Sequence, residues 1–147
     1  MRYQDSFEFN IEIAEGLRKS YIPSLIVQPF VENAMIHGIS MKNEMFRLRI
    51  SAKYVEEHSG AMCIEIVDNG KGTTDDKLAE LNSPEYVPVS EDRHIGIWNV
   101  KKRISMSYGE KSTVCFSPNE PSGFRVRLIL PVQYTEERDY DSDADCR

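Results

Sequence analysis

Three short polar clusters hold the side chains of this sequence that could do chemistry. The first is Glu32-Asn33, inside the largely apolar run IPSLIVQPFVENAMIHG. A buried carboxylate or amide costs roughly a few kcal/mol unless it has a partner. A glutamate can orient a nucleophile as a base, and an asparagine oxygen suits one position of a mostly hydrated Mg²⁺ shell. A surface stripe on a core helix would explain the same pair, so both interpretations stay open.

The second cluster is DNGKG, residues 68–72, directly after an apolar strand pattern. Asn-Gly after a strand is a hairpin signal, but the TTDDKLAELN that follows does not alternate as a second strand would. Alternatively, Asp68 ends the strand and accepts a hydrogen bond from an exocyclic amine such as that of adenine. Gly70 and Gly72 would then let the backbone approach a flat ligand closely.

The third cluster is HIGIWNVKKR, residues 94–103, where Gly96 enters a helix after a long loop. The free N–H groups at the start of a helix form a ready anion site. Lys101, Lys102 and Arg103 add positive charge one turn further on. An ordinary loop-to-helix junction with solvated cations explains the same residues, and this cluster alone does not choose between the two.

Hydrophobic spacing predicts the elements that position these clusters. Strict alternation predicts a half-buried strand at 7–13 and further strands at 46–54, 61–68, 112–117 and 124–131. Helical spacing predicts a helix from Pro23, or only from near Pro29, to about Gly38. It also predicts helices at 74–82 and 95–108, with a loop over 82–94. The fold class is therefore α/β (α+β), a two-layer sandwich of helices on one face of a mixed, mainly antiparallel sheet.

Composition bounds the function classes. The chain has 147 residues and a net charge of −6, which argues against a duplex DNA or other nucleic-acid binder. We expect one domain at 1–133 and an acidic tail at 134–147. Three scattered cysteines (Cys63, Cys115 and Cys146) indicate a reducing compartment rather than a disulfide framework. No stretch approaches the roughly 18 apolar residues of a membrane span.

Together, in this order, the three clusters resemble one family. ENAMIHG is similar to the N box, DNGKG to the first glycine box, and IGIWNVKKRI with the later YG to the second glycine region of the GHKL, or Bergerat-type, ATP-binding fold. The phrase IPSLIVQPFVENAMIHG resembles the catalytic domain of bacterial sensor histidine kinases of the LytS/YesM type. The resemblance covers about residues 2–131.

The resemblance implies roles for particular residues. It implies that Asn33 ligates Mg²⁺ held by the phosphates of ATP, and that Glu32 is the general base or orients the acceptor histidine. His37 would lie near the nucleotide. Asp68 would bind the adenine amine. The remaining implied binding residues are Gly70 and Gly72 at the adenine wall and Gly96, Ile97 and Asn99 at the phosphate end, with a lid at about 73–94.

Three positions depart from the family pattern. His94 replaces the first glycine of the usual GxG, Ile36 replaces a basic residue before His-Gly, and Phe124 replaces the threonine of a common Gly-Thr. The histidine that such kinases phosphorylate lies in a helical segment N-terminal to this domain, and the sequence begins at MRYQDSF, already at the first strand. We therefore expect ATP binding without self-phosphorylation.

The partners implied are ATP or ADP, the phosphoacceptor segment of a dimeric parent kinase, and a downstream response regulator. The expected location is cytoplasmic, as part of a membrane-anchored sensor. One alternative is an ATPase or serine kinase of the same fold, in which Glu32 would activate water or a serine hydroxyl. The other is a nucleotide-free interaction domain, favoured by the departures at His94, Ile36 and Phe124.

Overall fold

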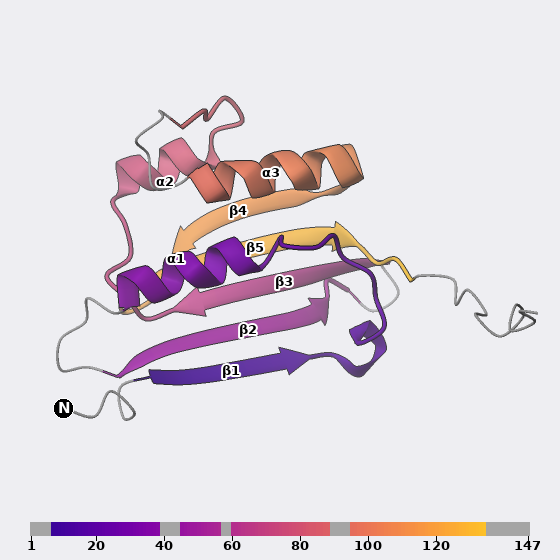
Figure 1. Cartoon of the computed structure of the whole chain (residues 1–147), viewed down its shortest axis with the longest axis horizontal. Helices are drawn as coiled ribbons and strands as arrows, with labels where there is room; N and C mark the ends of the chain where they lie inside the picture. Colours follow the sequence, from indigo (N-terminus) through magenta and orange to yellow (C-terminus); the bar gives the residue numbers. More distant parts are fainter. Residues whose placement is uncertain (1–6, 39–44, 57–59, 89–94, 135–147) are drawn as a thin grey trace, which may run out of the picture.

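Five strands form one mixed sheet in the computed structural model, which describes residues 7–38, 45–56, 60–88 and 95–134 (Figure 1). The strand order is β1-β2-β3-β5-β4, with β1 and β2 parallel and the other neighbours antiparallel. The strands are β1 (Phe7–Ile13), β2 (Phe46–Tyr54), β3 (Ala61–Asp68), β4 (Thr113–Pro118) and β5 (Phe124–Pro131). β2 and β3 are consecutive antiparallel neighbours and form a hairpin, and the strands predicted at 46–54 and 61–68 are confirmed.

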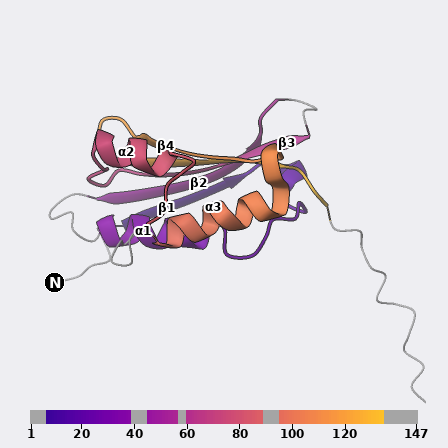
Figure 2. The ribbon, with the colours of Figure 1, turned by 90° about the horizontal axis from the view of Figure 1, so that it is seen from above.

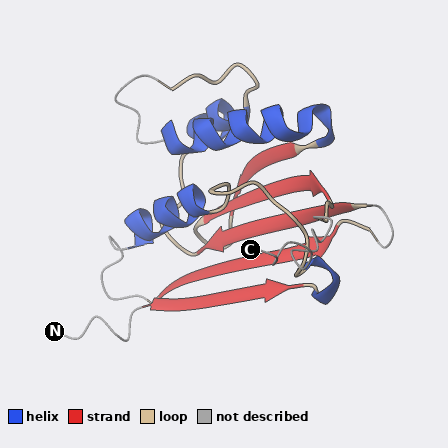
Figure 3. Cartoon of the chain, turned by 45° about the vertical axis from the view of Figure 1, so that its right-hand side comes forward, coloured by secondary structure: helices blue, strands red, loops and turns tan. Residues whose placement is uncertain are grey.

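Two long helices cover one face of this sheet (Figure 2). The helices are α1 (Gln28–Gly38), α2 (Asp75–Asn82) and α3 (Ile95–Tyr108), with short 3-10 helices at Glu15–Leu17 and Gly109–Lys111. α1 contacts β2, β3 and α3, whereas α2 packs beside β4. The segment that leads from the first 3-10 helix into α1 crosses the same face of the sheet (Figure 3). The predicted two-layer α+β class is confirmed.

The core lies between these helices and the inner faces of β2 to β5. On α3, four residues at helical spacing are buried: Ile97, Val100, Ile104 and Tyr108. They belong to the same hydrophobic cluster as alternate residues of β5, of which Leu128 and Leu130 are 0% exposed. The outer face of the sheet is polar. Its residues include Arg47, Arg49, Lys53, Glu65, Arg125 and Arg127.

α1 begins at Gln28, the later of the two predicted starts. Leu25 has φ 63°, a left-handed conformation that a helix cannot continue through. Pro29 is then the second helical residue, in the first turn, where a missing N–H costs nothing. Arg103 of α3 holds the preceding turn by donating from Nη1 to the carbonyl of Ser24 at 3.1 Å. α3 therefore helps to fix where α1 starts.

The prediction that strand 7–13 is half-buried is wrong. All seven residues of β1 are exposed, and the apolar ones keep 41–54% of their surface accessible. β1 is an edge strand, and the helix layer ends over β2 (Figure 1). Alternation identified a strand with one apolar face, but about half of the surface of that face's residues stays exposed.

At the opposite edge, α2 protects β4. Thr74 caps α2, its hydroxyl accepting from the N–H of Lys77 at 3.3 Å. At the other end, the Asn82 side chain exchanges two hydrogen bonds with the backbone of Phe116, at 2.8 and 2.9 Å. Asn82 thus occupies the place of a neighbouring strand at this position of the edge.

Among the helices in the described part of the chain, none has the length and apolar character that crossing a bilayer requires. The acidic tail from Glu136 lies outside the described residues, as does His94.

Candidate functional site

Asp68, the last residue of β3, is a buried carboxylate with only 6% of its surface exposed. Its Oδ1 accepts the backbone N–H of Gly70 at 2.8 Å and that of Phe124 at 3.3 Å. A carboxylate offers about four acceptor positions. Two backbone donors from separate segments therefore fix the orientation of Asp68.

The loop before β5 holds the end of β3 in place. Asn119 donates from Nδ2 to the carbonyl of Asp68 at 3.0 Å, and Ser122 donates from Oγ to the carbonyl of Asn69 at 3.3 Å. Gly123 has φ 117°, and a Cβ at this position would overlap the backbone of Asp68. Only glycine allows this approach, so the loop fixes the carboxylate rigidly.

A small pocket of about 60 Å³ opens beside Asp68. Its lining residues are Asn33, Asp68, Gly72, Thr73, Leu81, Ile97 and Phe124. Gly72 has φ 69°, and a Cβ there would lie 2.8 Å from the carbonyl oxygen of Gly123. The predicted need for glycine at this position therefore has an internal cause, the contact between the two loops.

Of the predicted residues on α1, Asn33 lines the pocket and is half-buried. Glu32, the next residue back, is exposed and accepts a hydrogen bond from Gln28 Nε2 at 2.7 Å. Consecutive helical side chains diverge by about 100°, so the two residues point in different directions. The side chain of His37 lies outside the described residues.

On α3, Ile97 is 2% exposed and closes the pocket. Gly96 lies at the helix start, where an added Cβ would contact Pro29 of α1 at 3.6 Å. Asn99 is exposed and does not line the pocket. The structure thus brings Asn33, Asp68, Gly72 and Ile97 together. The other described candidates are not in its lining: Glu32, Gly70, Gly96 and Asn99.

Sequence reasoning did not select Thr73 or Leu81, and it treated Phe124 only as a lost hydroxyl. Phe124 forms a pocket wall, and its ring lies on Phe116 with centroids 5.8 Å apart. The start of a strand at Phe124, opposite the end of β3, could have indicated this neighbourhood. Nothing in the local pattern marks Leu81 as more than an ordinary core residue of α2.

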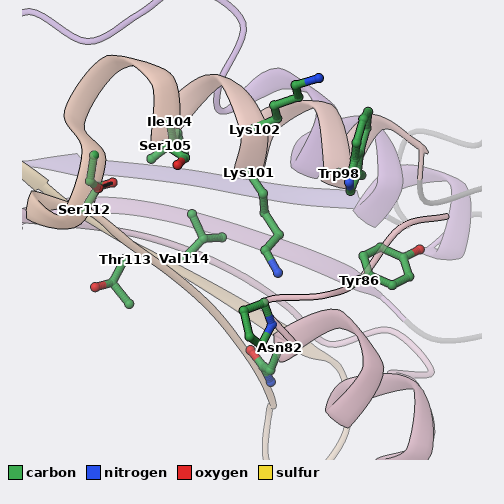
Figure 4. Close-up of a pocket in the computed structure, with 12 residues that line it drawn as sticks. Asn82, Tyr86, Trp98, Lys101, Lys102, Ile104, Ser105, Ser112, Thr113 and Val114 are labelled. Atoms are coloured by element: carbon green, nitrogen blue, oxygen red, sulfur yellow. Dashed lines mark hydrogen bonds between the residues drawn. The ribbon is translucent and has the colours of Figure 1, made fainter.

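A larger pocket of about 470 Å³ lies between α3, β4 and the end of α2 (Figure 4). Lys101 crosses it and donates from Nζ to the carbonyls of Leu81 at 2.6 Å and Ser83 at 3.2 Å. Burial lowers the pKa of this lysine. Lys102 instead lies over the ring of Trp98, 5.0 Å from its centroid.

This larger pocket holds Lys101 and Lys102 of the third cluster, but none of the residues to which the resemblance gives a binding or catalytic role. The smaller pocket contains the buried carboxylate and three further predicted residues, so we assign the candidate site there despite its size. The two are joined through α2, because Leu81 lines the smaller pocket and its carbonyl accepts the Lys101 bond.

The domain has one helix layer on a mixed sheet, with a buried carboxylate at the end of β3. The family model of histidine kinase-, DNA gyrase B- and HSP90-like ATPases matches residues 22–134. The chain belongs to this family, and its domain is an ATP-binding one.

Several curated relatives are sensor histidine kinases. The chain is 28% identical over 132 residues to sensor histidine kinase YesM of Bacillus subtilis, covering 90% of this chain and 21% of the relative. It is 31% identical over 130 residues to sensor histidine kinase BtsS of Escherichia coli K12, covering 88% and 20%. The chain therefore spans about a fifth of the length of these relatives.

Solved structures share the fold. The mycobacterial sensor histidine kinase MprB matches with a TM-score of 0.64 at 14% identity, covering 88% of this chain and 85% of that one. The nucleotide-free catalytic domain of histidine kinase ThkA matches with a TM-score of 0.61 at 16% identity, covering 90% and 83%. At these identities the likeness concerns the fold alone.

Proposed function

We propose that this chain is the ATP-binding catalytic domain of a two-component sensor histidine kinase. In its full-length context it transfers the γ-phosphoryl group of ATP to a histidine in an N-terminal helical segment. The proposal rests chiefly on Asp68, a buried carboxylate oriented by two backbone donors at the end of β3. The family match and the sensor kinase relatives support it.

Asp68 is suited to recognise the adenine base. Its carboxylate accepts from the N6 amine of the base, and Ile97 and Phe124 supply apolar walls. Ligand pockets commonly measure roughly 300–1,000 Å³, so this pocket of about 60 Å³ admits the edge of a base only. The ribose and phosphates extend beyond it, toward the start of α3.

The residues present fit a magnesium ion carried by the nucleotide. The described residues contain no group of three or more His, Cys, Asp or Glu that could cage a metal. Mg²⁺ characteristically uses one or two protein oxygens together with substrate phosphates and waters. The amide oxygen of Asn33 in the pocket lining would be such a ligand, and the Mg²⁺ that it helped to hold would supply neutralisation of phosphate charge.

Glu32 acts on the nucleophile rather than on the nucleotide. Its exposed position on α1, beside Gln28, leaves it accessible to an incoming histidine. A carboxylate there orients the imidazole and accepts its proton, while ATP stays fixed by Asp68 on the other side of the helix. Phosphoryl transfer then depends chiefly on position and charge neutralisation.

The remaining predicted residues contact either the base or the phosphates of the nucleotide. Gly70 and Gly72 shape the base wall, since Gly70 orients Asp68 and Gly72 lines the pocket. Gly96 and Ile97 stand in the first turn of α3, whose free N–H groups favour phosphate, and Asn99 follows at the start of the second turn. His37 is assigned to the nucleotide by the family resemblance alone.

The partners follow from this role. ATP and ADP bind the domain, a phosphoacceptor segment of the same dimeric kinase receives the phosphoryl group, and a response regulator takes it onward. The domain works on the cytoplasmic side of a membrane-anchored sensor, where ATP is available.

The testing experiment is autophosphorylation of the full-length kinase with Mg²⁺-ATP, followed as acid-labile phosphohistidine. The Glu32→Gln variant keeps the size of the side chain but removes the base, so its rate falls by about 10²- to 10⁴-fold. Its affinity for ATP, measured by calorimetry, stays at the wild-type value because Glu32 is not in the pocket lining.

Full phosphotransfer by the Glu32→Gln variant would remove Glu32 from the mechanism. Rapid ATP turnover by the isolated domain would favour an ATPase instead, with Glu32 activating water. Absence of binding at millimolar ATP would support the nucleotide-free interaction domain.

A further inference from the structure

The inner face of β1 is an apolar surface left open. Phe7, Phe9, Ile11 and Ile13 pair with Phe46, Leu48, Ile50 and Ala52 of β2, so the two sets share the helix-covered face of the sheet. Phe46 and Leu48 are 4% and 1% exposed, whereas their β1 partners Phe7 and Phe9 are 44% and 46% exposed. The inner face of the sheet is therefore buried at β2 and exposed at β1.

α1 forms the wall of this open surface. Pro29 faces α3, because it lies beside Gly96. Val31 is about 200° further around the helix and so faces the β1 side, and Met35 follows one turn later. Met35 is 42% exposed. α1 contacts β2, the strand beside β1, so the inner face of β1 and this side of α1 together form an apolar step at the edge of the sheet, which is here called the trough.

We propose that this trough is the docking site for an amphipathic α-helix supplied by the polypeptide that precedes Phe7 in the full-length protein. A helix suits the trough because the layer on this face is already helical and helices lie side by side about 8–10 Å apart. The four apolar residues span about 20 Å, the length of roughly 13 helical residues.

The position of the trough identifies the occupant as the preceding chain. The polypeptide enters β1 at Phe7, which is itself one end of the apolar stripe, so a preceding helix has little distance to cross. About four-fifths of YesM and BtsS lie outside the region matched by this chain. A second copy of this chain fits less well, because its own stripe also lies at the bottom of a trough and α1 would obstruct face-to-face contact.

The inference extends the proposed function, which requires an N-terminal segment, by naming the surface that this segment contacts. It would connect movement of that segment to α1, the helix that carries Glu32 and Asn33. The docking of a helix on β1 and the binding of ATP are nevertheless separate properties. An experiment can therefore disprove one of them and leave the other intact.

Thiol labelling tests the proposal directly. Ile11→Cys places a thiol in the stripe, and Glu12→Cys places one on the adjacent residue, which is exposed and faces the other side of the sheet. Both variants are made in a background with the native cysteines replaced by serine, in the chain described here and in the full-length protein. Iodoacetamide is the probe.

The Ile11→Cys thiol reacts quickly in the short chain and at least about tenfold more slowly in the full-length protein, where labelling needs local opening. The Glu12→Cys thiol reacts at the same rate in both, and calorimetry shows unchanged ATP affinity in both short variants. Equal labelling of Ile11→Cys in the two proteins would overturn the proposal. So would protection in the short chain that depends on its concentration, because a second copy would then be the occupant. Loss of ATP binding with the labelling difference intact would defeat the proposed function alone.

Discussion

β1 and β5 carry the same sequence pattern and have opposite environments. FEFNIEI and FRVRLILP both alternate apolar with polar residues, and each directs its apolar set to the inner face of the sheet. On β5, Leu128 is 0% exposed under the helices, whereas on β1 Ile11 is 54% exposed. Alternation therefore specifies which face of a strand is apolar, and only the position within the sheet decides whether this chain covers it.

The two edges of the sheet differ in the same way. β4 is an edge strand, but Asn82 of α2 bonds to the backbone of Phe116 and Lys101 bridges α3 to the end of α2. β1 has no helix over its inner face in the described part of the chain (Figure 1). The edge at β4 is thus protected by residues of this chain, whereas no helix of the described residues lies over the inner face of β1.

The largest expected effect on stability distinguishes the apolar face of β5 from that of β1. Leu128→Ala leaves a cavity beneath the helices, so the free energy of unfolding falls by about 2–5 kcal/mol. Urea denaturation followed by circular dichroism measures the loss.

Ile11→Ala is the matched change on β1. It alters the free energy of unfolding by about 0.5 kcal/mol or less in this chain, because no cavity forms at an exposed site. Similar losses for the two variants would show that β1 is covered after all, and would contradict the comparison.

The next effect concerns the protected edge. Asn82→Ala removes two hydrogen bonds to Phe116 and leaves its backbone groups without that partner, so unfolding becomes easier by about 1–3 kcal/mol. Thermal and urea denaturation report the change.

Glu12→Ala on the open edge is its control and shifts the free energy of unfolding by no more than about 0.5 kcal/mol. If Asn82→Ala changed the free energy of unfolding as little as Glu12→Ala does, the packing of α2, and not the Asn82 side chain, would protect the edge of β4.

A smaller effect links the protected edge to the site. Lys101→Met breaks the bonds to Leu81 and Ser83, which frees the end of α2 and loosens the pocket wall formed by Leu81. We expect ATP affinity to fall about 2- to 10-fold, equivalent to roughly 0.4–1.4 kcal/mol. Calorimetric titration measures it.

Lys102→Met is the neighbouring control. Lys102 is exposed and lies over Trp98, away from α2, so its removal leaves the affinity unchanged. Equal losses in both variants would indicate a general charge effect on a nucleotide anion instead of a mechanical link.

Much of this fold could be predicted because local pattern decides it. The alternation of β2, β3 and β5 and the helical spacing of α3 each matched one element, since their apolar faces are buried within this chain. The start of α1 was predicted only as one of two options. The left-handed turn at Leu25 that decides it is held by Arg103, 78 residues later in the sequence.

In the candidate site too, the residues that local sequence identifies were predicted, and those that depend on tertiary packing were not. Asp68 and Asn33 were predicted from type and local position, and both lie in the pocket lining. Phe124 and Leu81 were not selected, because their place in the site depends on strand order and on α2 packing beside β4. Gly72 was predicted for approach to a ligand, but the neighbour that requires glycine there is Gly123.

The central claim is that the end of β3 recognises the nucleotide base, and titration of Asp68→Asn with Mg²⁺-ATP tests it most directly. Asparagine keeps an oxygen for the N–H groups of Gly70 and Phe124, but it places an amide donor opposite the adenine amine. Calorimetry should show a loss of about 1–3 kcal/mol, roughly 5- to 150-fold in affinity. Asp76→Asn, an exposed change in the first turn of α2, should bind as the wild type does. Wild-type affinity in a folded Asp68→Asn variant would contradict the account and place base recognition elsewhere.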